Sequence, residues 1–260
     1  MALETNSRIV LVGAGNMGTV MAYALKEGGN APVAVWSRTI ESASLLGERV
    51  GCAFTDDLAS LPAADIVVIS VVDNALRDVA AAVAAKYPDA LLLHTAGSIP
   101  MDALREAGAV RYGVLYPMQT VNKNSVVPLE DVTTFIEGCD DAATAQIREL
   151  AAIMSRKVVY ATSEQRSALH VAAVFACNFS NAVYNMAYEL MRRCGLPFDA
   201  MLPLIDEAAR KMHRMSPPEA QTGPARRGDE NVMNAHKAML DSELANIYEA
   251  LSNYIMKRNR

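Results

Sequence analysis

The sequence predicts a mixed α/β protein in which a parallel sheet with crossover helices is followed by an all-helical domain. Over the first 160 residues, short β-rich runs alternate with Ala-rich stretches, as in a parallel sheet whose strands are joined by helices. Several of these runs are apolar on both faces, as strands covered by helices on two sides must be. After about residue 161 only helical patterns remain. We therefore expect two domains, 1–160 and 161–260.

Each expected element follows from its own residues. Strands are predicted where apolar and β-branched residues cluster, at 8–12, 32–36, 65–72, 90–95 and 112–116, with two further runs at 132–136 and 157–160 that could extend the sheet. Helices are predicted between them at 17–28, 40–50, 74–86 and 101–107. One long helix is expected over 163–194, because Gly195 and Pro197 follow as stop signals. Beyond it we expect a helix at 198–214, a loop rich in Pro and Gly at 216–228, and helix over 229–258 with a break near Asp241.

Composition and charge exclude several classes of protein. The 260 residues are 52% hydrophobic and 20% charged, which allows a sizeable core and excludes a disordered chain. The net charge of -5 argues against a nucleic-acid-binding protein. No run reaches the ~18 apolar residues of a membrane span, and residues 1–7 lack the order of a signal peptide. The four cysteines are far apart, which predicts reduced thiols and no metal site. We expect a cytoplasmic protein without membrane or nucleic-acid partners.

A glycine-rich motif follows the first predicted strand directly. It reads Gly13-Ala14-Gly15-Asn16-Met17-Gly18, and it opens an Ala-rich helix that leads to a second strand. This context predicts a Rossmann-type dinucleotide site. Gly13 permits the tight turn, Gly15 lets the backbone approach a pyrophosphate, and Gly18 lets helix and strand pack closely. The helix N-terminus then faces the negative charge.

The end of the second strand favours NADP(H) over NAD(H). Ser37-Arg38-Thr39 stands where an acidic residue would bind a ribose 2′-hydroxyl. Arg38 can bind a 2′-phosphate in a bidentate manner, with the hydroxyls of Ser37 and Thr39 as further donors. The alternative is that Arg38 only caps a surface loop.

Three further cofactor contacts are expected at the carboxyl ends of the third and fourth strands, namely Val71, Val72 and Thr95, because ligands bind at this edge in such folds. His94, at the end of the fourth strand, could touch nicotinamide or substrate. It could equally be a strand-end histidine that is bonded to backbone.

The long predicted helix carries a polar stripe. At 100° per residue, His170, Asn178, Asn181 and Asn185 fall within an arc of about 80°. Such groups on an apolar helix cost free energy unless they are satisfied. They could form an interhelical hydrogen-bond ladder or an exposed stripe, or they could line a cleft that faces the nicotinamide.

Four segments together resemble a known family. They are VGAGNMG (12–18), LYPMQTV (115–121), ALHVAAVFACNFSN (168–181) and TGPARRGD (222–229). The chain resembles NADP oxidoreductases that have a Rossmann-like domain and a helical C-terminal domain of unknown function. These proteins are similar to deazaflavin-dependent NADP oxidoreductases, and distantly to pyrroline-5-carboxylate reductases and to 6-phosphogluconate and 3-hydroxyisobutyrate dehydrogenases. The resemblance implies a second domain like the C-terminal domain of 6-phosphogluconate dehydrogenase, which pairs two copies of the chain.

The catalytic candidates depart from those relatives. In the β-hydroxyacid dehydrogenases a catalytic lysine precedes an asparagine by one helical turn, whereas Val174 and Cys177 hold those places here. Lysine-assisted oxidation is therefore disfavoured. His170 becomes the acid/base candidate, since imidazole titrates near neutral pH, with Asn178 beside it.

Substrate contacts are expected from Gln119, Asn181, Thr222 and Arg226. The loop that carries the last two has an alternative reading, in which Arg227 and Asp229 form a structural pair and Asp229 caps the helix that follows.

These observations lead to two hypotheses. The first is an NADP(H)-dependent oxidoreductase that transfers hydride between nicotinamide and a small carbonyl or imine substrate in a cleft between the domains. The second is an NADP-binding sensor or assembly protein without turnover, because a fold alone does not decide function. The long helix is apolar in several directions, which predicts that the helical domain forms a homodimer.

Overall fold

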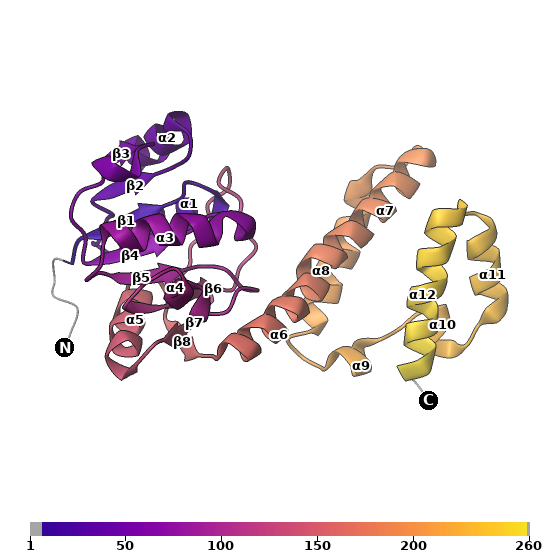
Figure 1. Ribbon diagram of the computed structural model, residues 1–260. Helices are drawn as coiled ribbons and strands as arrows, with labels where there is room; N and C mark the ends of the chain where they lie inside the picture. Colours follow the sequence, from indigo (N-terminus) through magenta and orange to yellow (C-terminus); the bar gives the residue numbers. More distant parts are fainter. Residues whose placement is uncertain (1–6, 259–260) are drawn as a thin grey trace. The chain divides into compact units, whose positions relative to one another are not determined.

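The computed structural model describes residues 7–258, and the chain divides into two compact units, Met1–Cys177 and Asn178–Arg260 (Figure 1). We expected residues 1–7 not to form a signal peptide; residues 1–6 of that segment lie outside the described residues. The boundary between the units falls inside the long helix. The last strand of the sheet ends at Tyr160, next to the domain boundary predicted between residues 160 and 161. That domain boundary stays a prediction.

The first unit is built on one eight-stranded sheet with the order β3-β2-β1-β4-β5-β6-β7-β8. Its strands are β1 (Ile9–Val12), β2 (Ala34–Trp36), β3 (Ala53–Thr55), β4 (Ile66–Ile69), β5 (Leu91–His94), β6 (Arg111–Pro117), β7 (Thr133–Gly138) and β8 (Lys157–Tyr160). All neighbours are parallel except β6 and β7, which are antiparallel. The chain runs outward from β1 to β2 and β3, then returns to the other side of β1 with β4. The strand order therefore reverses beside β1, where ligands bind in open α/β sheets.

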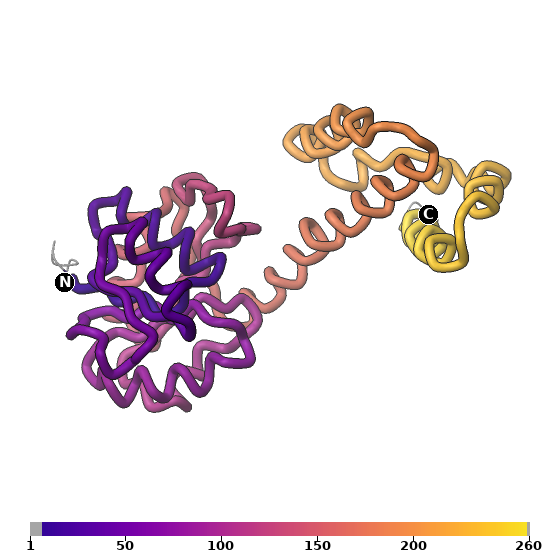
Figure 2. Tube along the Cα trace, turned by 90° about the horizontal axis from the view of Figure 1, so that it is seen from above, coloured from indigo at the N-terminus to yellow at the C-terminus, as the bar shows by residue number. Residues whose placement is uncertain are grey.

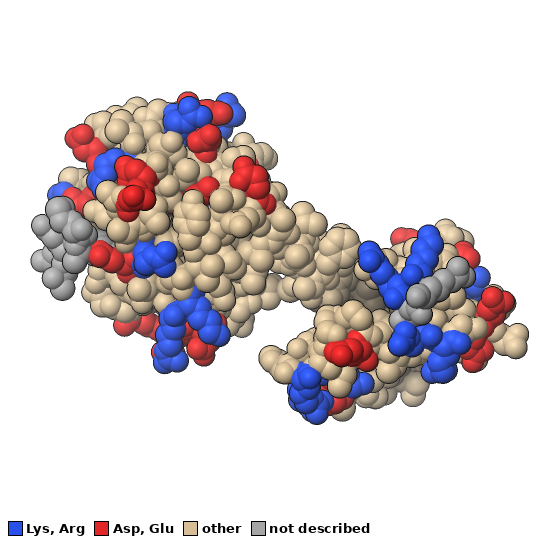
Figure 3. Space-filling model, turned by 90° about the horizontal axis from the view of Figure 1, so that it is seen from below, with Lys and Arg blue, Asp and Glu red and all other residues tan. Residues whose placement is uncertain are grey.

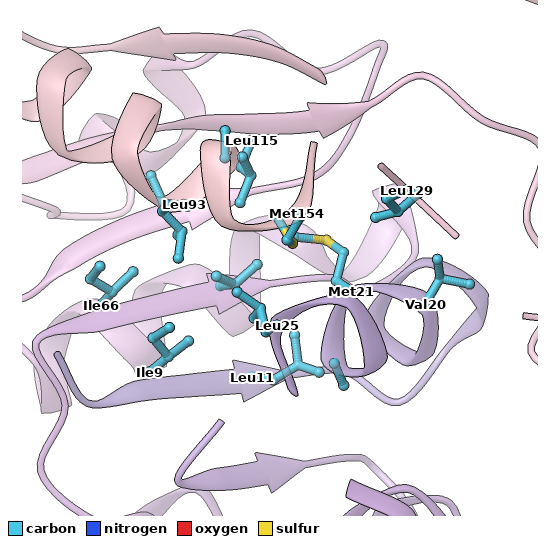
Figure 4. Packing of buried hydrophobic residues seen from close by; sticks show 14 of the residues in the cluster. Ile9, Leu11, Val20, Met21, Leu25, Ile66, Leu93, Leu115, Leu129 and Met154 are labelled. Carbon is cyan, nitrogen blue, oxygen red and sulfur yellow. The ribbon is translucent and has the colours of Figure 1, made fainter. Parts of the chain in front are cut away.

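Helices cover both faces of this sheet. The first unit contains α1 (Asn16–Glu27), α2 (Ile40–Val50), α3 (Leu76–Lys86), α4 (Asp102–Glu106), α5 (Asp141–Met154) and α6 (Ser163–Ala173), with short 3₁₀ helices at Leu58–Ser60 and Asp73–Ala75. One core cluster joins α1, α2 and α5 to the sheet, with Met21 and Leu25 of α1 close to Met154 of α5 (Figure 4). A second cluster holds α3 and α4 on the opposite face. Because helices bury both faces of the sheet, its central strands are continuous apolar runs.

The second unit is helical. After the π-helical segment Val174–Phe179 it contains α7 (Ser180–Arg193), a 3₁₀ helix (Phe198–Met201), α8 (Leu202–Lys211), α9 (Pro217–Ala220), α10 (Pro224–Arg227), α11 (Glu230–Ala238) and α12 (Ser242–Arg258). α6, the π segment and α7 follow one another along the chain without a break in helical structure (Figure 2). α7 and α8 have no buried residue.

Most predicted elements are confirmed, including α2 and β8 at their predicted bounds and the break near Asp241. Two elements were missed. The first is α5, although its sequence has the signals of a helix: Asp140 accepts a hydrogen bond from the Ala143 amide as an N-cap, and apolar residues recur at helical spacing. β3 is a three-residue edge strand, too short to stand out in the sequence. The predicted 216–228 loop contains the short helices α9 and α10.

Candidate functional site

The glycine-rich loop takes the shape that its sequence predicts. Gly13 has φ +119°, and its amide donates a hydrogen bond of 2.8 Å to the Trp36 carbonyl. A Cβ at Gly13 would collide with the Ser70 carbonyl oxygen, and one at Gly18 would collide with the Gly13 carbonyl oxygen. These two glycines are therefore required by close packing of β1, β4 and the start of α1.

Gly15 serves a different purpose, because a Cβ built on it meets nothing within 4 Å. It is exposed and forms the N-cap of α1 without any side-chain cap, and the first turn of α1 holds no acidic residue. The amides at this helix end therefore face open space, and the helix dipole favours a negative charge there. This arrangement fits a dinucleotide pyrophosphate.

The other loop residues support it. Ala14 is buried, and Met17 packs against the core. The Asn16 side-chain oxygen accepts a hydrogen bond of 3.1 Å from the Lys123 amide, which ties the segment after β6 to this loop.

The residues after β2 are placed to bind an anion. The Ser37 amide donates to the Thr55 carbonyl at 3.2 Å, and Thr39 is the N-cap of α2, with its hydroxyl 3.0 Å from the Ser42 hydroxyl. Arg38 is exposed and has no hydrogen bond or ion pair with any residue in 7–258. No contact therefore supports the alternative that Arg38 caps a loop. Its guanidinium remains available for a phosphate.

The carboxyl ends of β4 and β5 meet at one edge, as predicted. Val71 is half-buried there, and Val72 is 65% exposed. The Thr95 hydroxyl lies 3.2 Å from that of Ser70, so these two loops are joined.

His94 is a strand-end histidine that is hydrogen-bonded to the backbone, the second of the two alternatives predicted for it. It is fully buried, and its Nδ1 accepts a hydrogen bond of 3.2 Å from the Ala96 amide. Burial, with a smaller effect of the Arg166 charge, lowers the pKa of His94 to about 4. Its imidazole is therefore neutral at physiological pH and closed to solvent.

His170, on α6, lies against the loop that follows β5. Its Nδ1 is 3.1 Å from the Tyr116 hydroxyl, and the two rings meet edge to face with centroids 6.3 Å apart. A Cβ on Gly97 would come within 2.6 Å of His170 Nδ1. The sequence analysis did not identify Tyr116 or Gly97 as site residues. The one available signal was that Tyr116 ends the predicted strand at 112–116 and lies within the LYPMQTV motif.

A buried ion pair holds α6 one turn before His170. Arg166 Nη1 donates to Glu137 Oε2 of β7 at 2.6 Å, and the two side chains are 1% and 8% exposed. Arg166 Nη2 donates to the Ile99 carbonyl at 2.6 Å, and the Ser163 amide and hydroxyl both donate to the Glu137 carboxylate. α6 is thus fixed to β7 and to the loop after β5.

The predicted polar stripe runs through a π-helical segment and stays a prediction. The arc of about 80° assumed a regular α-helix, but Val174–Phe179 is π-helical, so each residue there turns by less than 100°. Asn178, Asn181 and Asn185 are all exposed, and the Asn185 amide donates to Glu189 at 3.2 Å. A role for Asn178 in catalysis and for Asn181 in substrate binding stays a prediction.

The remaining substrate candidates fall in both units. Gln119 follows β6, half-buried, and its side-chain oxygen accepts from the Thr120 amide at 2.9 Å. Thr222 and Arg226 are exposed residues of the second unit. The Asp229 carboxylate accepts from the Val232 amide at 3.3 Å, which confirms the predicted helix cap. No ion pair joins Arg227 to Asp229 in the described chain, so that pairing is wrong.

Residues 7–258 contain neither a metal-binding cluster nor a membrane-spanning helix. No group of three or more His, Cys, Asp or Glu side chains has the arrangement to hold a metal ion. No helix in the described part of the chain combines the length and apolarity needed to cross a membrane.

Comparisons with known proteins bear on both units. Residues 132–255 match the family model "Domain of unknown function (DUF2520)", and residues 2–88 match "Shikimate / quinate 5-dehydrogenase". A search of curated proteins found no match.

Solved structures extend these matches over the whole chain. A reductive aminase from Aspergillus terreus (21% identity, TM-score 0.67, 98% of this chain and 95% of that one) and a pyrroline-5-carboxylate reductase from Coxiella burnetii (16%, 0.60, 98% and 99%) share the fold. A Bacteroides fragilis protein described as a "putative NADP oxidoreductase" is 44% identical, with a TM-score of 0.92, over 97% of this chain and 99% of that one. The chain therefore belongs to the same family as the Bacteroides protein, the NADP oxidoreductases in which a Rossmann-type domain precedes a helical domain of unknown function.

Proposed function

We propose that the protein is an NADP(H)-dependent oxidoreductase that transfers hydride between the nicotinamide and a small carbonyl or imine substrate. The observation that carries the proposal is the open glycine-rich loop at the point where the strand order reverses, with the free cation of Arg38 at the end of the neighbouring strand. The Bacteroides relative, described as an NADP oxidoreductase, and the A. terreus reductive aminase, solved with NADPH, support the same chemistry.

The residues of the first unit divide the binding of the cofactor. Gly13, Gly15 and the amides that open α1 would hold the pyrophosphate, since the dipole of α1 favours negative charge there. Ser37, Arg38 and Thr39 would hold the 2′-phosphate. Val71, Val72 and Thr95 would face the cofactor along the sheet edge. NADPH, when bound, supplies a hydride.

His170 is the proposed proton donor. As a carbonyl or imine carbon accepts hydride, its oxygen or nitrogen gains negative charge and must gain a proton. His170 has its Nδ1 engaged by Tyr116, and no residue within 7–258 forms a hydrogen bond with its Nε2. The ion pair between Arg166 and Glu137 keeps the helix that carries this imidazole in place.

Turnover tests this proposal directly. NADPH absorbance is followed over a library of carbonyl compounds and imines, and His170→Asn is compared with His213→Asn, the same change at an exposed histidine of the second unit. His170→Asn should lower turnover per folded molecule ~10²–10⁴-fold, the usual worth of general acid catalysis, while the Kd for NADPH stays unchanged. Normal turnover per folded molecule would remove His170 from the mechanism. NADPH binding without turnover of any substrate would favour the sensor or assembly protein.

The proposal includes a homodimer formed through the helical unit. From Ser167 to Tyr188 the helix carries no charged side chain, and Phe175 and Phe179 in this stretch are 66% and 51% exposed. Elsewhere, charged side chains of both signs lie mixed on the visible faces of both units (Figure 3). Because water disfavours such apolar exposure, a second copy of the chain is the proposed cover. Light scattering should give twice the monomer mass at micromolar concentration, and a monomer would contradict this part. A cytoplasmic location is also proposed, supported by four free cysteines.

A further inference from the structure

We propose that Tyr116 is a positioning residue for His170, which occupies Nδ1 of the imidazole and so leaves Nε2 as the nitrogen that meets the substrate. The inference deepens the proposed function and rests on it, because it assumes that His170 supplies the proton. It concerns residues of the first unit only, so the contacts that carry it lie within one compact part of the chain.

The contact is held from three sides. Tyr116 is the penultimate residue of β6 and is 8% exposed, so its ring has little freedom. The imidazole meets that ring at an interplanar angle of 68°. Beneath it lies Gly97, where even a methyl group would come within 2.6 Å of Nδ1. The position of the imidazole is thus fixed by the hydroxyl and the ring of Tyr116 and by the backbone of Gly97.

The hydroxyl decides which nitrogen holds the proton. Burial raises the pKa of Tyr116 above its usual value, so the phenol keeps its hydrogen. A buried hydroxyl needs a partner, and His170 Nδ1 is the only partner of this hydroxyl among the described residues. In the neutral state the hydroxyl donates to Nδ1, so the imidazole carries its hydrogen on Nε2.

The same hydroxyl also serves the charged state, because a phenol oxygen can accept as well as donate. In the imidazolium, Nδ1–H donates to the Tyr116 oxygen. The Nε2–H bond then breaks toward the substrate oxygen or nitrogen as the adjacent carbon takes the hydride with its electron pair. The electrons of that N–H bond remain on Nε2, and the proton forms the new O–H or N–H bond. The imidazole left by this transfer carries its hydrogen on Nδ1, and a proton taken from water at Nε2 restores the imidazolium. Tyr116 is present throughout and loses no proton.

The second unit contains a matched control. The His236 Nδ1 lies 3.0 Å from the Tyr248 hydroxyl, with ring centroids 5.8 Å apart and an interplanar angle of 86°. The pair has the same chemistry but lies on helices α11 and α12, with His236 exposed. A Tyr→Phe change at each position therefore separates the effect at His170 from the general effect of removing a tyrosine.

Nuclear magnetic resonance of the full chain tests the proposal without any substrate. The protein has four histidines, so ¹⁵N labelling of histidine alone gives a simple spectrum, in which His170→Asn identifies the His170 signals. At a pH where the imidazoles are neutral, the His170 spectrum should show the hydrogen on Nε2. Tyr116→Phe should shift the Nδ1 resonance of His170, since that nitrogen loses its hydrogen bond. Tyr248→Phe should shift His236 alone.

Two results would overturn the assignment: a hydrogen on Nδ1 in the unaltered protein, or an unchanged His170 spectrum in folded Tyr116→Phe. Gly97→Ala provides a second route, because it keeps the tyrosine and displaces the imidazole, and it should shift the same resonance. None of these readouts depends on turnover. An inactive protein with the expected spectra would refute the proposed function and leave only the hydrogen bond between Tyr116 and Nδ1 of His170 standing. An active protein with unchanged spectra would refute the role of Tyr116 and leave the proposed function standing.

Discussion

The ion pair between Arg166 and Glu137 gives the sharpest test of how the first unit is held together. Glu137→Gln removes one charge and leaves the Arg166 guanidinium, which is 1% exposed, without a counterion. The new amide would also point a donor at the Ser163 amide or hydroxyl, both of which donate to the present carboxylate. Breaking a buried pair in this way costs about 3–5 kcal/mol, because a charge stays buried without compensation. At about 2–4 °C per kcal/mol for a unit of this size, the Tm should fall by about 6–20 °C.

Thermal unfolding and urea unfolding, both followed by tryptophan fluorescence, are the assays. The chain has a single tryptophan, Trp36 in β2, so the signal reports the first unit. The control is Glu106→Gln, which breaks the exposed pair with Arg77, where the side chains are 50% and 73% exposed. An exposed pair contributes about 1 kcal/mol at most, so this variant should unfold almost as the unaltered protein does.

A double variant separates the charge from the packing. Glu137→Met with Arg166→Met removes both charges and should recover part of the lost stability, since apolar residues often replace a buried pair without loss. A loss of under about 1 kcal/mol in Glu137→Gln would show that water reaches the Arg166 guanidinium, and that the ion pair does not anchor α6.

Three other predictions concern the cofactor and pH. Arg38→Ala should weaken NADPH binding by about 1.5–3 kcal/mol and leave NADH nearly unchanged, because the guanidinium reads only the 2′-phosphate; equal losses in calorimetry would contradict this. Gly15→Val should keep the Tm, since its Cβ meets nothing within 4 Å, yet abolish nucleotide binding by blocking the pyrophosphate; retained affinity would refute the assigned loop. His94 has a pKa of about 4 in the native state against 6.5 for a free histidine, so the unfolded chain alone takes up this proton as the pH falls between those values. The free energy of unfolding should therefore fall by up to ~1.4 kcal/mol per pH unit over that window, and His94→Asn should remove this dependence; the same slope in both proteins would mean that His94 is not responsible.

The sequence predicts the sheet and the nucleotide loop well, because both depend on short-range patterns. The strands at 8–12 and 65–72 are apolar on both faces, and the glycines that join the first of them to α1 follow at fixed spacing. Such features are local, so the neighbouring residues determine them.

The candidate acid site was predicted only in part, since it depends on contacts between distant segments. His170 was found from its residue type, but its partner Tyr116 and the space above Gly97 come from β6 and from the loop after β5. The π-helical segment within the long helix was missed, because it cannot be read from a periodicity of 3.6. The buried charge of Arg166 was also missed, since a lone arginine in a helical sequence gives no sign of its burial.

The close approach of Gly97 to His170 has a consequence for comparing sequences. Because a side chain at 97 and an imidazole at 170 compete for one space, the two positions should change together among relatives. A relative that keeps histidine should keep glycine, whereas one with a small residue at 170 is free to hold alanine or serine at 97. The pair would then sort members of the family into those built for an imidazole at this place and those that use another group.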